Sequence, residues 1–152
     1  GFMDPLRFEV LAGNPTDRQI HDINELLKQL TSNPKLIETS ALKKMLDQSG
    51  VFVVVITNTE GRSIAMATLA VRSFLLNTSA MIEDVVVDSK YRGIRLGKNI
   101  MEHLITMARE KGCSFISLTS HPRRKETNHM YQELGFELIG KIRESNYYRL
   151  YL

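Results

Sequence analysis

Two glycines and the cations Arg92, Arg95 and Lys98 stand close together in the sequence MIEDVVVDSKYRGIRLGKNIMEHL, shortly after an apolar run. The run at 80–88 predicts a strand, and the apolar spacing from about 95 to 110 predicts a helix after it. A helix begins with N–H groups that have no partner, and these groups lie at the positive end of the helix dipole. The chemistry that this junction could do is therefore to bind an anion such as a phosphate.

The residue types at this junction support the same interpretation. Gly93 and Gly97 lack a Cβ atom, so phosphate oxygens can approach the main chain, while Arg92, Arg95 and Lys98 add positive charge. Cations in a first helical turn oppose the dipole at about 0.3–1 kcal/mol each, so three together indicate a bound anion. An ordinary glycine turn with solvated basic side chains is the alternative. Neither GxxxxGK[ST] nor GxGxxG occurs, which excludes a P-loop and a dinucleotide fingerprint.

The elements that must position this turn follow from hydrophobic spacing. Alternating or continuous apolar runs predict strands at 6–12, 51–57, 63–76, 80–88, 111–120, 135–142 and 146–152. Helical spacing predicts helices at about 17–30, 38–48, 95–110 and 123–134. The resulting order is β, α, α, β, β, β, α, β, α, β, β, which indicates a mixed α/β fold with antiparallel strands.

Composition narrows the functional classes. The chain has 152 residues, 43% hydrophobic residues and a net charge of +3, which fits one globular domain and gives little support to nucleic-acid binding. Its single cysteine, Cys113, excludes an internal disulfide and suggests a buried residue and a cytoplasmic protein. No apolar run is long enough to span a membrane, and no signal peptide is predicted. Gly1 and Phe2, before Met3, are interpreted as a remnant of cloning.

Two motifs resemble those of a known family. The segment IEDVVVDSKYRGIRLGKNIMEHL is similar to the central motif of the GNAT superfamily of acyl-CoA-dependent N-acyltransferases, [RQ]xxGx[GA] after a strand. The pattern falls on Arg92, Arg95 and Gly97, and departs at Arg95, where the family usually has glycine. The segment NHMYQELGFEL is similar to the family's NxxYxxLGF. The resemblance implies a single GNAT domain over residues 1–152, with a mixed, mostly antiparallel sheet of six to seven strands and about four helices.

The resemblance also implies an activity and a set of binding residues. An acetyl group would pass from acetyl-CoA to a primary amine by direct attack in a ternary complex. A bulge would splay the strand at 80–88 from its neighbour, and a backbone N–H near Val86 would polarise the thioester carbonyl. The residues implied to bind the cofactor are Val85, Val86, Val87, Arg92, Gly93, Ile94, Arg95, Leu96, Gly97, Lys98, Asn128 and Tyr131.

Direct attack needs a base, because an alkyl amine with a pKa of about 10.4 is protonated at neutral pH. Glu83 and Asp84 interrupt an apolar strand, and strand alternation predicts that they point to opposite faces. Glu83 is the favoured base and Asp84 a structural carboxylate, with His121 as a weaker alternative base. Tyr131, which matches the family's tyrosine, would protonate the departing thiolate. Asn128 would point into the same slot and bond the pantetheine or the phosphates.

Several questions stay open at this level. The cluster Arg123, Arg124 and Lys125 is predicted either to meet nucleotide phosphates or to be a solvated face. The first two helices and the tyrosines of the last strands, Tyr147, Tyr148 and Tyr151, would select the acceptor, a small-molecule or protein amine. Alternative functions are a glucosamine 6-phosphate N-acetyltransferase, a non-catalytic acyl-CoA-binding module and a nucleic-acid binder. No residue spacing suggests a metal site, and no nucleic-acid or membrane partner is expected, whereas a homodimer is possible.

Overall fold

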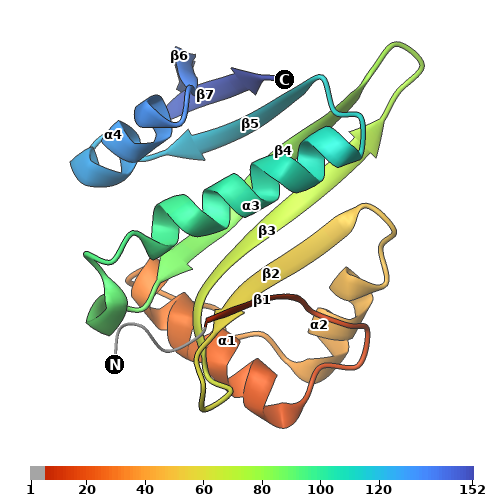
Figure 1. Ribbon diagram of the computed structural model, residues 1–152, viewed down its shortest axis with the longest axis vertical. Coiled ribbons are helices and arrows are strands. Elements are labelled where there is room, and N and C mark those ends of the chain that lie inside the picture. Colours follow the sequence, from red (N-terminus) through yellow and green to blue (C-terminus); the bar gives the residue numbers. More distant parts are fainter. Residues whose placement is uncertain (1–5) are drawn as a thin grey trace.

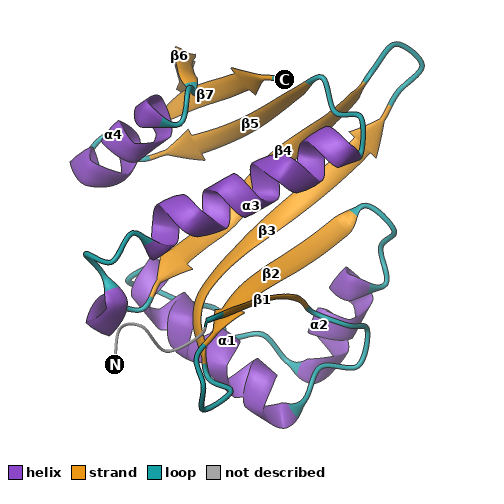
Figure 2. Ribbon diagram, in the orientation of Figure 1, coloured by secondary structure: helices purple, strands orange, loops and turns teal. Residues whose placement is uncertain are grey.

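Helices and strands follow one another along the chain in the order that hydrophobic spacing predicts. The computed structural model describes residues 6–152 (Figures 1 and 2). The elements are β1 (Arg7–Val10), α1 (Asp17–Leu30), α2 (Thr39–Leu46), β2 (Val51–Thr57), β3 (Ser63–Ser73), β4 (Thr78–Val87), the 3₁₀ helix η1 (Ser89–Tyr91), α3 (Leu96–Glu110), β5 (Phe115–Ser120), α4 (Lys125–Glu133), β6 (Glu137–Ile142) and β7 (Ser145–Tyr151).

The strands form one seven-stranded sheet in the order β1-β2-β3-β4-β5-β7-β6. The pair β4–β5 is parallel, and the other neighbouring pairs are antiparallel. Helix α3 provides the crossover between the two parallel strands, as such a connection requires. The predicted fold class, a mixed and mostly antiparallel sheet with four helices, is confirmed.

Each face of the sheet carries its own apolar core. Helix α3 lies along one face (Figure 1), where Ile100, Met101 and Leu104 are fully buried against β2, β3 and β4. Helices α1 and α2 cover the other face, with Leu26 and Leu42 at the centre of that core. Alternate residues of the central strands pack into the two cores, so most residues of these strands are apolar.

Some element boundaries differ from the prediction. Strand β3 ends at Ser73, and Phe74, Leu75 and Leu76 are exposed in the hairpin that leads to β4. The chain reverses there through a hydrogen bond from the Phe74 N–H to the Asn77 carbonyl at 2.7 Å. Apolar composition predicts a longer strand at this point because periodicity does not register a reversal.

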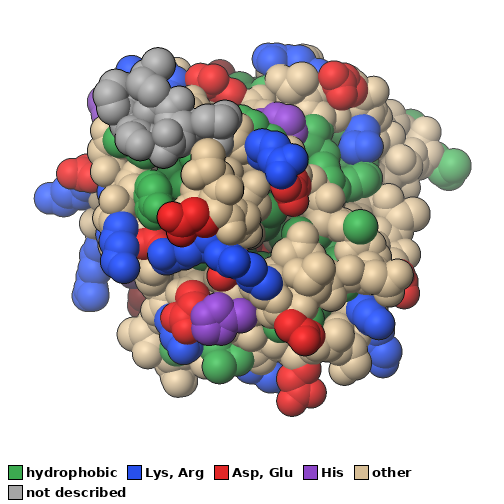
Figure 3. All heavy atoms as spheres, turned by 60° about the horizontal axis from the view of Figure 1, so that its bottom comes forward, with side chains coloured by type: hydrophobic (Ala, Val, Ile, Leu, Met, Phe, Trp, Pro, Cys, Tyr) green, Lys and Arg blue, Asp and Glu red, His purple; other side chains and the backbone are tan. Residues whose placement is uncertain are grey.

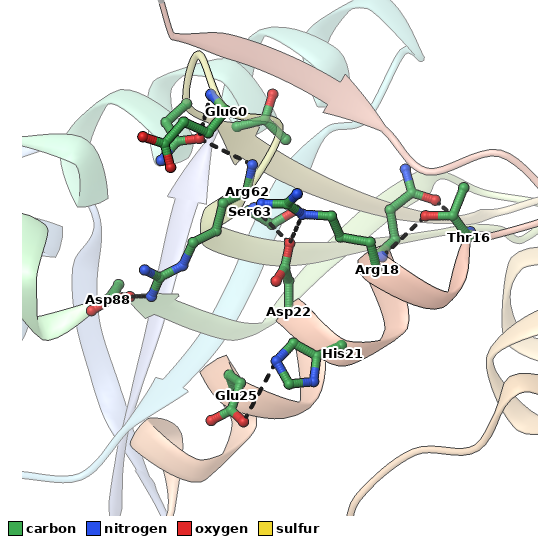
Figure 4. A network of polar contacts seen from close by, with 12 residues as sticks. Thr16, Arg18, His21, Asp22, Glu25, Glu60, Arg62, Ser63 and Asp88 are labelled. Carbon is green, nitrogen blue, oxygen red and sulfur yellow. Dashed lines mark hydrogen bonds and ion pairs between the residues drawn. The ribbon is translucent and has the colours of Figure 1, made fainter.

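A polar network fixes α1 against the sheet (Figure 4). The buried Asp22 accepts the Ser63 N–H at 3.0 Å, and its Oδ2 atom lies 3.9 Å from the Arg18 Nε atom. Thr16 begins the helix with a capping box in which its side chain accepts the Gln19 N–H. Because a buried carboxylate is costly without partners, these contacts fix how α1 meets the start of β3.

One face of the surface carries charges of both signs. Acidic and basic side chains alternate over the face shown in Figure 3, which brings the bottom of Figure 1 forward. Within residues 6–152, no helix has the length and apolar character needed to cross a membrane.

Candidate active site

Strand β4 carries a bulge at its centre. Thr68 of β3 pairs with Glu83 and Met66 pairs with Val86, so one residue of β3 stands opposite two of β4. Asp84 at this point has a φ of 58°, a left-handed conformation that is uncommon for a residue with a side chain. A bulge in this strand agrees with the prediction. It bends β4 and changes the direction of the side chains beyond it.

The bulge brings two carboxylates to one face of the sheet. Glu83 stands opposite Thr68 in the ladder, so their side chains share a face. Asp84 accepts a hydrogen bond from the Thr68 hydroxyl at 2.9 Å and therefore lies on that face as well. The prediction that Glu83 and Asp84 point to opposite faces is wrong, because strict alternation fails where an extra residue is inserted.

The environment of Glu83 is suited to a base. Its side chain reaches solvent, but partial burial raises the pKa of its carboxyl, and the neighbouring Asp84 raises it further. A carboxylate with a raised pKa accepts a proton more readily than an ordinary one.

Strands β4 and β5 separate soon after they meet. Their ladder consists of the pairs Ala80–Ile116 and Met81–Ser117, and the strands diverge beyond it (Figure 1). The Asp88 N–H donates to the Ile64 carbonyl at 2.8 Å, so the antiparallel ladder directs the Val86 N–H toward β3 as well. The Val87 N–H and the Val85 carbonyl consequently face the open edge. The donor expected near Val86 stays a prediction, and the ladder shows that the neighbouring Val87 N–H faces the open edge whereas the Val86 N–H faces β3.

The turn after β4 is anchored by a residue that sequence reasoning missed. Asp88 is buried and forms an ion pair with Arg62 (Figure 4). It also accepts the Lys90 N–H at 3.0 Å. The next residue, Ser89, donates its N–H to the Gln29 side chain of α1 at 2.8 Å. An Asp directly after an apolar strand is a common turn former, and this signal could have identified Asp88.

The first turn of α3 presents N–H groups without intrahelical partners, as predicted. The Arg95 carbonyl accepts the first intrahelical bond, from the Asn99 N–H at 3.0 Å, so the N–H groups of Leu96, Gly97 and Lys98 have no intrahelical partner. Arg95 itself is the N-cap with a φ of 65°, and its side chain makes no capping bond.

Gly97 lies where the first turn of α3 meets α4 and β4. A Cβ atom at Gly97 would lie 3.4 Å from the Met130 Sδ atom of α4 and 3.7 Å from a Val87 methyl group of β4. The absent side chain keeps the first turn of α3 close to both neighbouring elements. Met130 is a second contact that sequence reasoning did not single out.

These elements enclose a groove of about 640 Å³, here called the basic groove. Its lining brings together the cations of both basic clusters: Arg92, Arg95, Lys98, Arg123, Arg124 and Lys125. Val85, Val86, Val87, Gly93, Leu96 and Gly97 also line it. Two carboxylates, Glu126 and Glu133, are the acidic residues of the lining. The groove therefore has a strong excess of positive charge, at the start of α3 and beside the start of α4.

Three of the predicted cofactor residues lie outside this lining: Ile94, Asn128 and Tyr131. Ile94 is 43% exposed. The Asn128 amide is buried, donates to the His121 and Arg124 carbonyls at 2.9 and 2.7 Å, and accepts from the Tyr148 hydroxyl at 2.7 Å and from Asn146 at 3.3 Å. These four bonds use its full donor and acceptor capacity. These bonds hold α4 in position and leave the Asn128 side chain no free donor or acceptor for the cofactor.

Tyr131 is buried against aromatic neighbours one turn further along α4. Its ring packs at 5.9 Å from Phe136 and 6.0 Å from Tyr148. Burial raises the pKa of its phenol to about 12; Glu83 and Tyr148 add to the rise, and Arg124 opposes it. The hydroxyl consequently keeps its proton at every physiological pH, as a proton donor must. Since Glu83 acts on this pKa, the bulge carboxylate and the phenol are electrostatic neighbours.

Comparison with known proteins places this geometry in a family. The model of the Acetyltransferase (GNAT) family matches residues 20–136. This chain belongs to the GNAT acetyltransferase family. The acetyltransferase is 35% identical over 118 residues to a glucosamine 6-phosphate N-acetyltransferase of Trypanosoma brucei brucei. The aligned region covers 74% of this chain and 78% of the relative. The enzyme is therefore an acyltransferase, and its family uses acetyl-CoA.

Solved structures agree with this membership. A crystal structure of a Trypanosoma brucei acetyltransferase superposes with a TM-score of 0.75 at 30% identity, over 91% of this chain and 96% of that one. The NatC complex bound to Gag peptide and CoA shares the fold, with a TM-score of 0.77 at 18% identity over 97% of this acetyltransferase and 98% of that chain.

The left-handed conformation of Arg95 gives a physical reason for the glycine that GNAT proteins usually have there. We expect Arg95→Gly to raise the free energy of unfolding by about 1 kcal/mol, because a side chain at positive φ costs on the order of 1–2 kcal/mol. Arg92→Gly is the matched control: it also removes one cation from the turn, but its φ of −69° is ordinary, so glycine should destabilise there. Urea denaturation of both variants checks this, and equal effects of the two substitutions would contradict it.

Proposed function

We propose that the basic groove binds the diphosphate and nucleotide of acetyl-CoA. The observation that carries this proposal is the convergence of two basic clusters and the N-terminus of α3 on one groove beside the open edge of β4. Backbone N–H groups of Leu96, Gly97 and Lys98 would bond the diphosphate oxygens. Arg123, Arg124 and Lys125 would neutralise the remaining phosphate charge, which favours the phosphate-binding alternative for that cluster.

The pantetheine arm would continue between β4 and β5. The Val87 N–H and the Val85 carbonyl at the open edge would bond its amides, as an additional strand would. In this arrangement the thioester reaches the bulge, near Glu83 on β4 and Tyr131 on α4. The separation of β4 from β5 after two ladder pairs supplies the room for the arm.

The proposed reaction is direct transfer to a primary amine. Glu83 takes a proton from the ammonium of the acceptor, and the neutral nitrogen attacks the thioester carbonyl carbon. As the tetrahedral intermediate collapses, its C–S bond breaks, and the Tyr131 hydroxyl gives its proton to the departing sulfur. The attacking nitrogen still carries one proton more than the amide product. The Tyr131 phenolate takes this proton and so returns to its starting state, while Glu83 releases its own proton to solvent, so atoms and charges balance. Because the relative in Trypanosoma brucei brucei bears the name of a glucosamine 6-phosphate N-acetyltransferase, that amino sugar is one candidate acceptor.

Binding of acetyl-CoA is tested by thermal stability. At a concentration one hundred times its dissociation constant, acetyl-CoA should stabilise the protein by about 2.7 kcal/mol and raise Tm by roughly 5–10 °C. Gly97→Val should abolish most of this shift, because its methyl groups fill the space between Val87 and Met130.

Gly140→Val is the matched control for this experiment. The same substitution at Gly140 meets no atom within 4 Å, on the exposed strand β6. This variant should keep the full shift. Equilibrium dialysis that finds no binding of acetyl-CoA to the unmodified protein would overturn the proposed function.

A further inference from the structure

A second hollow of about 610 Å³ lies on the face of the sheet that α1 and α2 cover. It is here called the apolar pocket. Its apolar lining comes from α1, the segment between α1 and α2, α2 and the strands beneath: Ile23, Leu27, Leu36, Ile37, Ala41, Leu42, Met45, Val53 and Met66. Four further residues, Lys35, Glu38, Thr68 and Asp84, complete it. This volume is in the range of small-molecule sites.

Asp84 is the polar group contributed by the β4 bulge. Its Oδ2 atom is held by the Thr68 hydroxyl at 2.9 Å. Its Oδ1 atom makes no hydrogen bond within residues 6–152, so one carboxylate oxygen is free for a ligand. A carboxylate beside apolar walls favours a cationic partner, because an unpaired charge is costly there. An ammonium group on an apolar carbon body fits both parts of the pocket.

The charges of the lining disfavour a phosphorylated acceptor. Lys35 is its cation, whereas Glu38 and Asp84 are carboxylates, and Glu83 is the chain neighbour of Asp84. A phosphate monoester carries about −1.5 to −2 charges at pH 7 and needs several cations or N–H donors. The cations that could supply them line the other hollow, the basic groove.

Consecutive residues of the bulge line the apolar pocket and the basic groove. Asp84 lines the pocket, and the next two residues, Val85 and Val86, line the groove. An amine nitrogen held by Asp84 would consequently lie beside Glu83 and near the position proposed for the thioester. The carbon body would extend toward Leu36 and Met45.

We propose that the acceptor of this enzyme is a primary amine with an apolar carbon body, such as an arylalkylamine, rather than a phosphorylated amino sugar. Asp84 binds its ammonium group, and the walls from α1, α2 and their connection bind its carbon body. This inference rests on the proposed function, because the same bulge must deliver the amine to acetyl-CoA. It also assigns acceptor selection to the first two helices rather than to the last strands, where Tyr148 is fully buried and bonded to Asn128.

The first test compares two acceptors. Release of the coenzyme A thiol is measured with phenethylamine and with glucosamine 6-phosphate, and the acetylated product is identified by mass spectrometry. We expect kcat/KM for phenethylamine to be at least about tenfold higher, because the pocket buries its ring and lacks a phosphate site. A higher kcat/KM for glucosamine 6-phosphate overturns the proposal. The proposal is also overturned if dialysis shows that acetyl-CoA binds but phenethylamine neither reacts nor binds. Loss of acetyl-CoA binding instead marks failure of the proposed function.

The second test uses variants that keep the fold. Asp84→Asn retains the shape of the side chain, and asparagine tolerates the positive φ at this position. The variant should raise KM for phenethylamine about 10- to 100-fold, because the ammonium group loses its hydrogen bond to a charged carboxylate. Ala41→Trp, at an exposed position of α2 that lines the pocket, should raise KM by filling it. Ser40→Trp adds the same side chain at an exposed neighbouring position outside the lining and should leave KM unchanged. Equal effects of the two tryptophans, or an unchanged KM for Asp84→Asn, would overturn the assignment of this pocket.

Discussion

Replacement of Tyr131 by phenylalanine is expected to lower kcat by about 10²- to 10⁴-fold, the usual contribution of a positioned general acid. Phenylalanine keeps the ring that packs on Phe136 and Tyr148, so α4 should stay in place. Tyr131 lies outside the lining of the basic groove, so affinity for acetyl-CoA should change little. Steady-state kinetics together with equilibrium dialysis measures both quantities.

Tyr148→Phe provides the matched control. Both tyrosines are buried, and their rings pack on each other between α4 and β7. The Tyr148 hydroxyl, however, donates a hydrogen bond to the Asn128 side chain at 2.7 Å. Removal of the Tyr148 hydroxyl takes away one of the two hydrogen bonds that the Asn128 Oδ1 atom accepts. This loss should lower the free energy of unfolding by about 1–3 kcal/mol. If Tyr131→Phe keeps the kcat of the unmodified enzyme, the proton donor is another group and the role of Tyr131 is packing.

The pKa of Tyr131 adds an independent signature. Because the folded state raises this pKa from 10 to about 12, the neutral phenol contributes stability that is complete below pH 10 and is lost as the pH rises through 12. Tyr131→Phe removes this titration, so the loss of stability between pH 10 and 12 should become shallower. Denaturation curves across this range check it.

The order of the elements could be read from the sequence because each is long or strongly patterned. Strand β2 is a continuous apolar run, and α3 has apolar residues at helical spacing over four turns. The turn proposed to bind phosphate could be located for a similar reason, since Gly93, Gly97 and three cations lie within seven residues of the chain. Local patterns carry this information, and no long-range contact is needed to interpret it.

The remaining features depend on contacts between distant residues. The common face of Glu83 and Asp84 arises from the register between β3 and β4, which a single strand's alternation does not reveal. The task of Asn128 depends on Tyr148 and Asn146, which lie in β7. The apolar pocket requires residues from α1, α2 and three strands to meet. Sequence spacing therefore located the turn but did not distinguish residues that line the basic groove from residues that hold its walls in position.

Replacement of Glu83 by glutamine is expected to lower kcat by about 10²- to 10³-fold at neutral pH, because the proton of the bound ammonium loses its acceptor. Glutamine has the same shape, and the side chain reaches solvent, so binding of acetyl-CoA should be unaffected. In the unmodified enzyme, kcat should fall as the pH drops through the pKa of Glu83, which partial burial and Asp84 raise above 4.5. This acidic limb of the kcat profile should be absent in Glu83→Gln.

Stability should move in the opposite direction to activity in this variant. A carboxyl whose pKa is raised by folding contributes stability that is present below its unfolded pKa and is lost as the pH rises through the folded value. The ionised Glu83 is therefore slightly destabilising at neutral pH, and glutamine should leave the free energy of unfolding unchanged or higher. A variant that loses both activity and stability would indicate a structural role instead.

Asp84→Asn separates the base from its neighbour. Since the Asp84 carboxylate raises the pKa of Glu83, its neutralisation should move the acidic limb of the kcat profile toward lower pH without removing it. Glu83→Gln should remove the limb altogether. If instead Asp84→Asn removes the limb and Glu83→Gln only displaces it, Asp84 is the base, and the bulge presents the two carboxylates in the reverse roles.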